Sequence, residues 1–175
     1  MIYKLNDLVN EVRHDDTNSL RLFWRDEGAG RSFPKIENEC RDVLLKLLRP
    51  SLKPLSVHVD KEGSAANDGR VDLRASTTVE RRRVVVPIEI KKEDHRSVWT
   101  AWHDQLDGRY TTDPAAQGVG IYLVLWFGHK PKAAPNGRKP VSAMDLETLL
   151  RAEVPAADHA RLTICVIDLS LPNST

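Results

Sequence analysis

One apolar run constrains the fold of this chain more than any other feature. Residues 119–127 read Val-Gly-Ile-Tyr-Leu-Val-Leu-Trp-Phe and are bounded by Gly118 and Gly128. An apolar run of this length between glycines is typical of a β-strand buried on both faces, which requires helices on either side of the sheet. We therefore predict that this strand lies centrally in a covered sheet.

Apolar residues at helical spacing predict four helices. They lie at residues 2–12, 36–49, 98–106 and from Ser142 to Leu150. Pro50 is expected to end the second helix and Gly108 the third, while Ser142 can cap the fourth through its hydroxyl. Trp99 and Trp102 are expected to lie in the core, because aromatic residues at that spacing are more often core residues than base-stacking ones.

Short apolar or alternating runs predict the remaining strands. They are residues 55–60, 70–77, 83–91 and 162–169, and the first three are expected to form an antiparallel meander. A proline cannot donate to a sheet ladder, so Pro87 predicts a sheet edge or a bulge. Trp24 and residues 28–30 are expected to lie in a loop, as are residues 63–69 and 130–140. The order indicates an α/β fold with a mixed central sheet flanked by helices.

The composition suits one domain and leaves the partner open. The 175 residues, 41% of them hydrophobic, are enough to bury a core without disulfides. Cys40 and Cys165 lie among apolar neighbours, which favours buried thiols and a reducing, cytoplasmic setting. No signal peptide or membrane-spanning run is visible. The net charge of +1 neither excludes nor indicates nucleic acid, and the basic run at residues 81–83 is more often a solvated turn than a binding patch.

Residues that can carry chemistry gather on two neighbouring strands. The period of two places Glu89 and Lys91 on one strand face, with Ile88 and Ile90 on the other. A hairpin would set Asp72 beside Glu89. Paired carboxylates suit Mg²⁺, which prefers oxygen ligands and keeps several waters, and a bound metal acidifies water for phosphodiester hydrolysis. The same residues could instead form a cross-strand salt bridge, but charge in apolar surroundings is costly without a partner or a task.

An Asp on one strand followed by Glu-x-Lys on the next resembles the motif of the PD-(D/E)XK nuclease superfamily, here Asp72 and Glu89-Ile90-Lys91. The order of helices and strands also resembles that family's restriction-endonuclease-like αβββαβ core over about residues 34–127. The remainder of a single domain, residues 1–175, would be helical and helix-strand elaborations. One departure is Val71, which stands where the family has a proline. The resemblance implies a metal-dependent nuclease acting on DNA more than RNA, with Mg²⁺ as cofactor and Mn²⁺ as a substitute.

The resemblance also implies roles for further residues. Asp72, Glu89 and the carbonyl of Ile90 would hold the metal. The first core helix would add Glu37, which falls inside its apolar stripe, whereas Glu39 falls at the margin. Acidic residues are also favoured in a first helical turn whatever the function.

Substrate contacts are implied for Gln105 and Tyr110, which look like the Gln and Tyr of exonuclease-like branches, although four residues separate them here instead of three. The resemblance further implies an effector domain attached to or recruited by NTPase or defence proteins, and a homodimer stays open. One alternative is a catalytically inactive nucleic-acid-binding or assembly module that retains the nuclease fold. Another is an unrelated α/β domain with a chance Glu-x-Lys.

Overall fold

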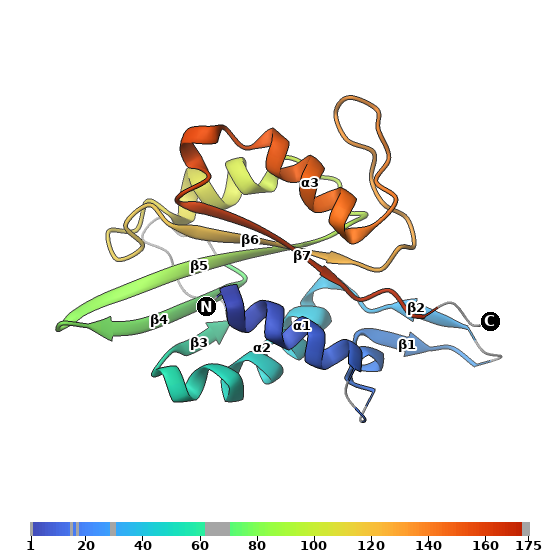
Figure 1. Cartoon of the computed structure of the whole chain (residues 1–175), viewed down its shortest axis with the longest axis horizontal. Helices are drawn as coiled ribbons and strands as arrows, with labels where there is room; N and C mark the ends of the chain where they lie inside the picture. Colours follow the sequence, from blue (N-terminus) through green and yellow to red (C-terminus); the bar gives the residue numbers. More distant parts are fainter. Residues whose placement is uncertain (1, 15, 17, 29–30, 62–70, 173–175) are drawn as a thin grey trace.

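In the computed structural model, which describes residues 2–14, 16, 18–28, 31–61 and 71–172, a five-stranded mixed sheet lies between two layers of helices (Figure 1). The sheet order is β3–β4–β5–β6–β7. Neighbouring strands are antiparallel from β3 to β5 and parallel from β5 to β7, so the expected meander is confirmed. The strands are β3 (His58–Lys61), β4 (Leu73–Val79), β5 (Arg82–Lys92), β6 (Gly120–Trp126) and β7 (Leu162–Asp168).

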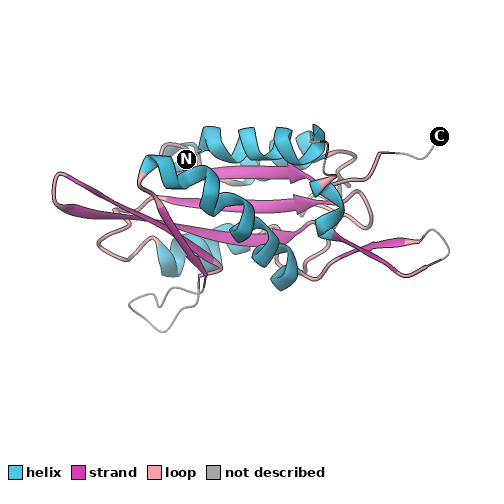
Figure 2. Ribbon diagram, turned by 90° about the horizontal axis from the view of Figure 1, so that it is seen from below, coloured by secondary structure: helices cyan, strands magenta, loops and turns pink. Residues whose placement is uncertain are grey.

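Helices cover both faces of this sheet (Figures 1 and 2). On one face lie α1 (Ile2–His14) and α2 (Glu37–Leu52), and on the other lie the π-helix η3 (Trp102–Tyr110) and α3 (Ala143–Glu153). Short 3-10 turns are η1 (Ser19–Phe23), η2 (Lys53–Leu55) and η4 (Ala156–Asp158). No helix among the described residues is long and apolar enough to cross a membrane.

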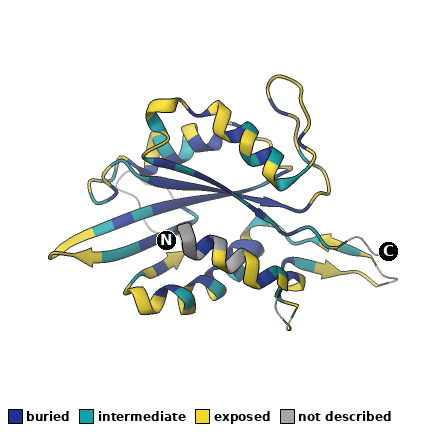
Figure 3. Ribbon diagram, viewed as in Figure 1, coloured by how far each residue is buried: buried dark blue, intermediate teal, exposed yellow. Residues whose placement is uncertain are grey.

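Alternation along the strands divides the interior into two cores. Ile88 and Ile90 pack in the core beneath α1 and α2, whereas the parallel neighbour of Glu89, Tyr122, belongs to the core beneath η3 and α3. Every residue of β6 is buried, as the apolar run predicted, and the buried centre of the sheet is visible in Figure 3. The face of β5 that carries Glu89 therefore lies under a helical layer.

Two predicted boundaries at the ends of helices are wrong. α2 continues through Pro50 to Leu52, because Leu52 is 1% exposed and extends the apolar stripe into the core. Pro50 lies in the last turn, where a missing donor removes one helix hydrogen bond. Gly108 lies within η3 instead of closing a helix; a Cβ there would meet the carbonyl oxygen of His103 at 3.1 Å, so this wide turn favours glycine.

A loop was expected around Trp24, but this region forms a two-stranded hairpin of β1 (Trp24–Asp26) and β2 (Ser32–Pro34). Its position depends on the end of the chain, since the Trp24 indole donates to the Leu169 carbonyl at 2.9 Å and meets Phe127 edge-on. The predicted loop at residues 63–69 lies outside the described residues.

Pro87 causes neither an edge nor a bulge, contrary to expectation, because it pairs with Arg74 within an unbroken β4–β5 register. Two residues earlier, the Val85 amide donates to Ala115, on the side away from β4. Backbone groups alternate along a strand, so the missing amide of Pro87 also faces away from β4. The β4–β5 ladder therefore loses no hydrogen bond.

Other local predictions are confirmed. The Ser142 side chain accepts from the Asp145 amide at 3.1 Å and so caps α3. Cys40 and Cys165 are buried free thiols, and burial raises the pKa of each to about 12. Trp99 and Trp102 pack in the core beneath η3 and α3.

Candidate functional site

The β4–β5 pairing brings Asp72 beside the Glu-x-Lys segment. Leu73, at the start of β4, pairs with Ile88, so Asp72 lies one residue beyond this pair, on the Glu89 side. The Asp72 carboxylate then accepts a hydrogen bond from the Ile90 amide at 2.9 Å. This bond fixes one oxygen of Asp72 at the end of the antiparallel ladder.

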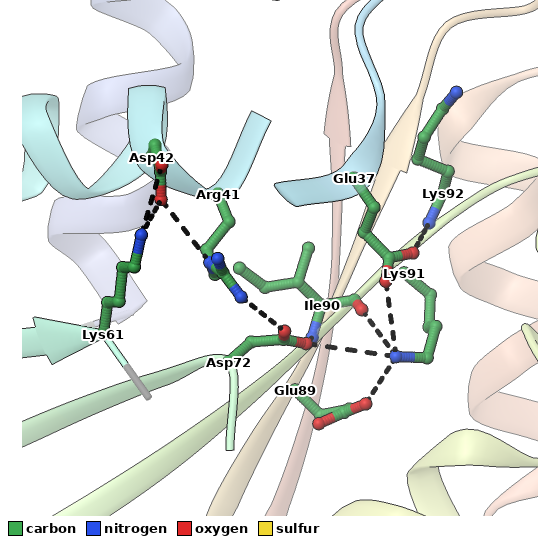
Figure 4. A network of polar contacts seen from close by, with 9 residues as sticks. All are labelled: Glu37, Arg41, Asp42, Lys61, Asp72, Glu89, Ile90, Lys91 and Lys92. Carbon is green, nitrogen blue, oxygen red and sulfur yellow. Dashed lines mark hydrogen bonds and ion pairs between the residues drawn. The ribbon is translucent and has the colours of Figure 1, made fainter. Parts of the chain in front are cut away.

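The Lys91 ammonium lies at the centre of the site (Figure 4). It donates to Glu89 Oε1 at 2.5 Å and to the Ile90 carbonyl at 2.9 Å. Its distances to Glu37 Oε1 and Asp72 Oδ2 are 3.6 and 3.9 Å. Carboxylates from a helix, a strand end and the strand itself therefore converge on one cation.

Of the acidic residues in the first turn of α2, Glu37 is the one that reaches this cluster. Its second oxygen accepts from the Lys92 amide at 3.2 Å, which ties the start of α2 to the end of β5. Glu39 instead pairs with Arg25 at 2.6 Å on an exposed surface. Hydrogen bonding by Arg25 lowers the pKa of the Glu39 carboxyl.

Arg41 is a buried member of the site that the sequence interpretation missed. It is 7% exposed, and its Nη1 lies 3.5 Å from Asp72 Oδ1. Its Nε lies 3.6 Å from Asp42, which in turn pairs with Lys61 at 3.4 Å (Figure 4). The available signal was its spacing, because Arg41 follows Glu37 by four residues and so shares its helix face.

Burial sets the protonation of the Glu89–Lys91 pair. Glu89 is 2% exposed; desolvation and then the nearby Asp72 carboxylate raise its pKa to about 7, although Lys91 opposes the shift. Burial lowers the pKa of Lys91, but the surrounding carboxylates outweigh burial and raise it overall. Lys91 therefore stays cationic at neutral pH, whereas Glu89 gains or loses its proton near pH 7.

Of the two residues proposed to contact substrate, Tyr110 interacts electrostatically with the carboxylates of the cluster. It is 6% exposed, and burial followed by the charges of Glu89 and Asp72 raises its pKa. Gln105 is half-buried on η3, and its side chain makes no hydrogen bond within the described part of the chain. The structure thus brings Tyr110 into electrostatic range of the carboxylates.

The carboxylates surround the Lys91 ammonium. They do not converge on a shared position where a metal ion could be bound. Over the described residues, no group of three or more His, Cys, Asp or Glu side chains is arranged to hold a metal ion. The donor set still suits a hard cation, because carboxylate oxygens are the ligands that Mg²⁺ prefers. Glu89 Oε2 is buried and lacks a hydrogen-bond partner among the described residues. A divalent ion therefore fits these donors if Lys91 moves away from them.

Comparisons with known proteins bear on the family of the chain. A family model described as "Domain of unknown function (DUF8371)" matches residues 3–129. No curated protein and no solved structure matches the chain. The matched span contains Glu37, Asp72, Glu89 and Lys91 and ends just after β6, before α3 and β7.

Proposed function

Since the chain belongs to the DUF8371 family, whose description carries no activity, we propose its function from the site: a metal-dependent nuclease that hydrolyses phosphodiester bonds in DNA. The observation that carries this proposal is the convergence of Glu37, Asp72 and Glu89 on the buried Lys91 ammonium. Charged groups placed where water is scarce are costly to maintain, and clusters of them gather at functional sites.

The topology supports the same proposal. The order α2, β3–β5, η3, β6 resembles the αβββαβ core of PD-(D/E)XK nucleases. Asp72 stands in the position of the family's Asp, and Glu89 and Lys91 in those of its Glu-x-Lys. A chance Glu-x-Lys in an unrelated α/β domain would not be expected to have an Asp from the neighbouring strand bonded to its central residue.

Each residue has a distinct role in the proposed reaction. Asp72, Glu89 and the Ile90 carbonyl would hold Mg²⁺ or its substitute Mn²⁺, with Glu37 as a further ligand. When bound, the ion supplies an acidified water and Lewis-acid stabilisation. Lys91, kept cationic by its neighbours, stabilises negative charge on the phosphoryl oxygens of the transition state.

Arg41 positions Asp72 in this scheme. Its guanidinium lies by Oδ1, while the Ile90 amide holds Oδ2, so both oxygens of that carboxylate are oriented by the protein. The side chains of Glu37 and Asp72 are 25% and 16% exposed, against 3% for Glu89. A DNA phosphate would therefore approach from the side of Glu37 and Asp72.

The second candidate is a catalytically inactive nucleic-acid-binding or assembly module with the same fold. The observation in its favour is that the Lys91 ammonium pairs with all three carboxylates. In an inactive module, the Lys91 ammonium would take the place of the metal ion permanently. Either function fits a domain attached to, or recruited by, an NTPase or defence protein, which we propose on the resemblance alone.

A cleavage assay tests the catalytic proposal. Linear, circular and single-stranded DNA and RNA are incubated with Mg²⁺, Mn²⁺ or a chelator, using wild type, Lys91→Ala and the exposed control Lys46→Ala. We expect metal-dependent cleavage by wild type and control, reduced about 100-fold or more in Lys91→Ala because a charge-stabilising donor is lost. No cleavage of any substrate, or equal cleavage by Lys91→Ala, contradicts the proposal.

A melting experiment separates the active from the inactive candidate. Binding of Mg²⁺ to the folded state raises its stability, by about 2.7 kcal/mol at a hundredfold excess over Kd. We expect this shift in wild type and its loss in Asp72→Asn. A melting temperature that does not respond to Mg²⁺ or Mn²⁺ favours the inactive module.

A further inference from the structure

The β4–β5 hairpin extends beyond the rest of the sheet (Figure 1). β3 pairs with β4 only as far as Ser76, and β6 pairs with β5 only from Ile88 onward. Residues 77–79 and 82–84 therefore pair with each other and with no other strand of the described sheet. We call residues 77–84 the ribbon; it is a two-stranded projection whose tip is exposed (Figure 3).

Positive charge gathers at the tip of the ribbon. Arg81, Arg82 and Arg83 are exposed, against a single acidic residue, Glu80. None of the three arginines makes an ion pair or side-chain hydrogen bond within the described residues. Elsewhere arginines are commonly matched with carboxylates, as in the pairs Arg138–Asp145 and Arg161–Asp158. The charge of the ribbon thus stays available to a partner.

The turn of the ribbon is strained by its own sequence. Glu80 and Arg81 have φ angles of 48° and 65°, the combination of a two-residue hairpin turn that normally takes Asn and Gly. Residues with side chains are unfavourable in this region. If this turn served only to connect two strands in solvent, glycine would be the favoured residue at position 81. A solvent-exposed turn therefore does not by itself account for the arginine there. Strain of this kind is typically kept at functional sites.

A hydroxyl-rich surface adjoins the ribbon on the side of β3. The neighbouring hollow, of about 250 Å³, is lined by Ser56, His58, Ser76, Thr77, Thr78 and Arg83. It shares residues with a second hollow that adds Arg49 and Lys53. Basic and hydroxyl side chains are the groups that contact phosphate oxygens of nucleic acids. A surface suited to the phosphate backbone of a nucleic acid therefore continues from the ribbon onto the body of the protein.

We propose that the ribbon tip, residues 79–83, inserts into the major groove of duplex DNA. The major groove of B-DNA is about 12 Å wide and admits a two-stranded ribbon, whereas that of A-form RNA is too narrow for side chains to read. Arginine binds guanine edges and phosphates through paired hydrogen bonds. The inference rests on the proposed function, because it supplies the substrate contact that the small catalytic cluster lacks.

The position of the ribbon sets the length of DNA involved. Arg81 precedes Glu89 by eight residues of extended chain, a span of about 26 Å at about 3.3 Å per residue. Along B-DNA this corresponds to about 8 base pairs. The ribbon would therefore contact the duplex at about this distance from the phosphate at the site.

Binding measured in the presence of a chelator tests the ribbon apart from cleavage. Fluorescence anisotropy is recorded for a labelled duplex with wild type, Arg82→Ser/Arg83→Ser, and the matched control Lys46→Ser/Lys139→Ser, which removes the same charge from exposed positions elsewhere. We expect the arginine variant to bind at least about 10-fold more weakly and to lower the salt slope by about 2. The control should stay within about twofold of wild type.

Arg81→Gly separates binding from folding. Glycine relieves the positive φ, so the melting temperature should stay equal or rise, while binding of the duplex weakens about threefold or more. In addition, wild-type affinity should increase as duplexes lengthen from about 8 to about 24 base pairs, and this increase should be smaller for the arginine variant. An Arg81→Gly variant that is more stable and binds as tightly as wild type overturns the inference.

The remaining outcomes also distinguish the two proposals. If Lys91→Ala abolishes cleavage but the ribbon variants bind duplex DNA like wild type, the nuclease proposal stands and the ribbon proposal fails. If binding depends on the ribbon but wild type cleaves nothing, the ribbon proposal stands and the nuclease proposal fails. Absence of duplex binding by wild type, or an equal loss on duplex RNA, contradicts the ribbon proposal.

Discussion

At the scale of single residues, the site is governed by the cost of placing charge where water is scarce. The Lys91 ammonium and the Glu89 carboxylate meet at 2.5 Å with side-chain exposures of 7% and 3%. Attraction between buried ions is largely offset by their desolvation, so the pair adds little net stability. Its consequence is chemical, because it holds one cation among carboxylates and leaves Glu89 ionised only above its raised pKa.

The raised pKa of Glu89 predicts a pH-dependent contribution to stability. The folded protein holds this proton up to about pH 7, whereas the unfolded chain releases it near 4.5, the ordinary pKa of a glutamate side chain. Stability from this group is therefore fully present below about pH 4.5, falls as pH rises to about 7, and is constant above. At about 1.4 kcal/mol per pKa unit, the fall is about 3 kcal/mol.

Urea unfolding of wild type and Glu89→Gln in chelator measures this contribution. Other carboxyls titrate over the same range, so the difference between the two proteins is the useful quantity. We expect wild type to lose stability relative to Glu89→Gln between pH 5 and pH 7.5, by about 2.4 kcal/mol of the full fall. A difference that does not change with pH is incompatible with a raised pKa.

At the scale of elements, one buried carboxylate joins the ends of the neighbouring parallel strands β5 and β6. Glu93, just after β5, is 2% exposed and accepts backbone hydrogen bonds from the segment that follows β6. Gly128 donates at 3.0 Å, His129 at 2.7 Å and Lys130 at 3.2 Å, and Phe127 donates as well. This contact holds β5 in place two residues beyond Lys91.

Replacing this carboxylate should destabilise the protein strongly. Glu93→Ala leaves four backbone donors without their acceptor, and each unsatisfied buried group costs about 1–3 kcal/mol, so we expect a loss of about 3 kcal/mol or more. The neighbouring control Asp94→Ala removes an exposed carboxylate that lies 3.9 Å from the partly buried Lys92 ammonium and should change stability by less than about 0.5 kcal/mol. Similar midpoints in urea for both variants would refute this role for Glu93.

At the scale of the whole molecule, the last two elements complete the fold. β7 pairs with β6 from Gly120–Leu162 to Trp126–Asp168, and Leu146 and Leu150 of α3 lie in the core on the η3 side. Both elements follow the span that the family model matches. Without them β6 would expose its edge and one buried face.

A truncation tests whether these elements are needed. The chain of residues 1–129 should aggregate or melt without a cooperative transition, since an exposed hydrophobic strand edge pairs with other chains. A chain ending at residue 172 should melt cooperatively as a control. Size-exclusion chromatography and thermal melting by circular dichroism report both properties. A cooperative, monodisperse chain of residues 1–129 would show that α3 and β7 are dispensable.

Patterns of nearby residues were sufficient for most elements and for the centre of the site. The period of two placed Glu89 and Lys91 on one face, and the apolar run of β6 predicted an inner strand. The β1–β2 hairpin was missed because Trp24 is held by Leu169, 145 residues away. Arg41 was missed because only the packing of α2 against the sheet places it beside Asp72.

Backbone periodicity was enough to predict which residues share a strand face and which segments are helical. Three features required the folded structure: the desolvation that raises the pKa of Glu89 to about 7, the pairing of Lys91 with several carboxylates, and the projection of the ribbon beyond its neighbouring strands. Desolvation, ion pairing and strand exposure depend on contacts between elements that are distant in the chain. Local sequence patterns do not predict those contacts.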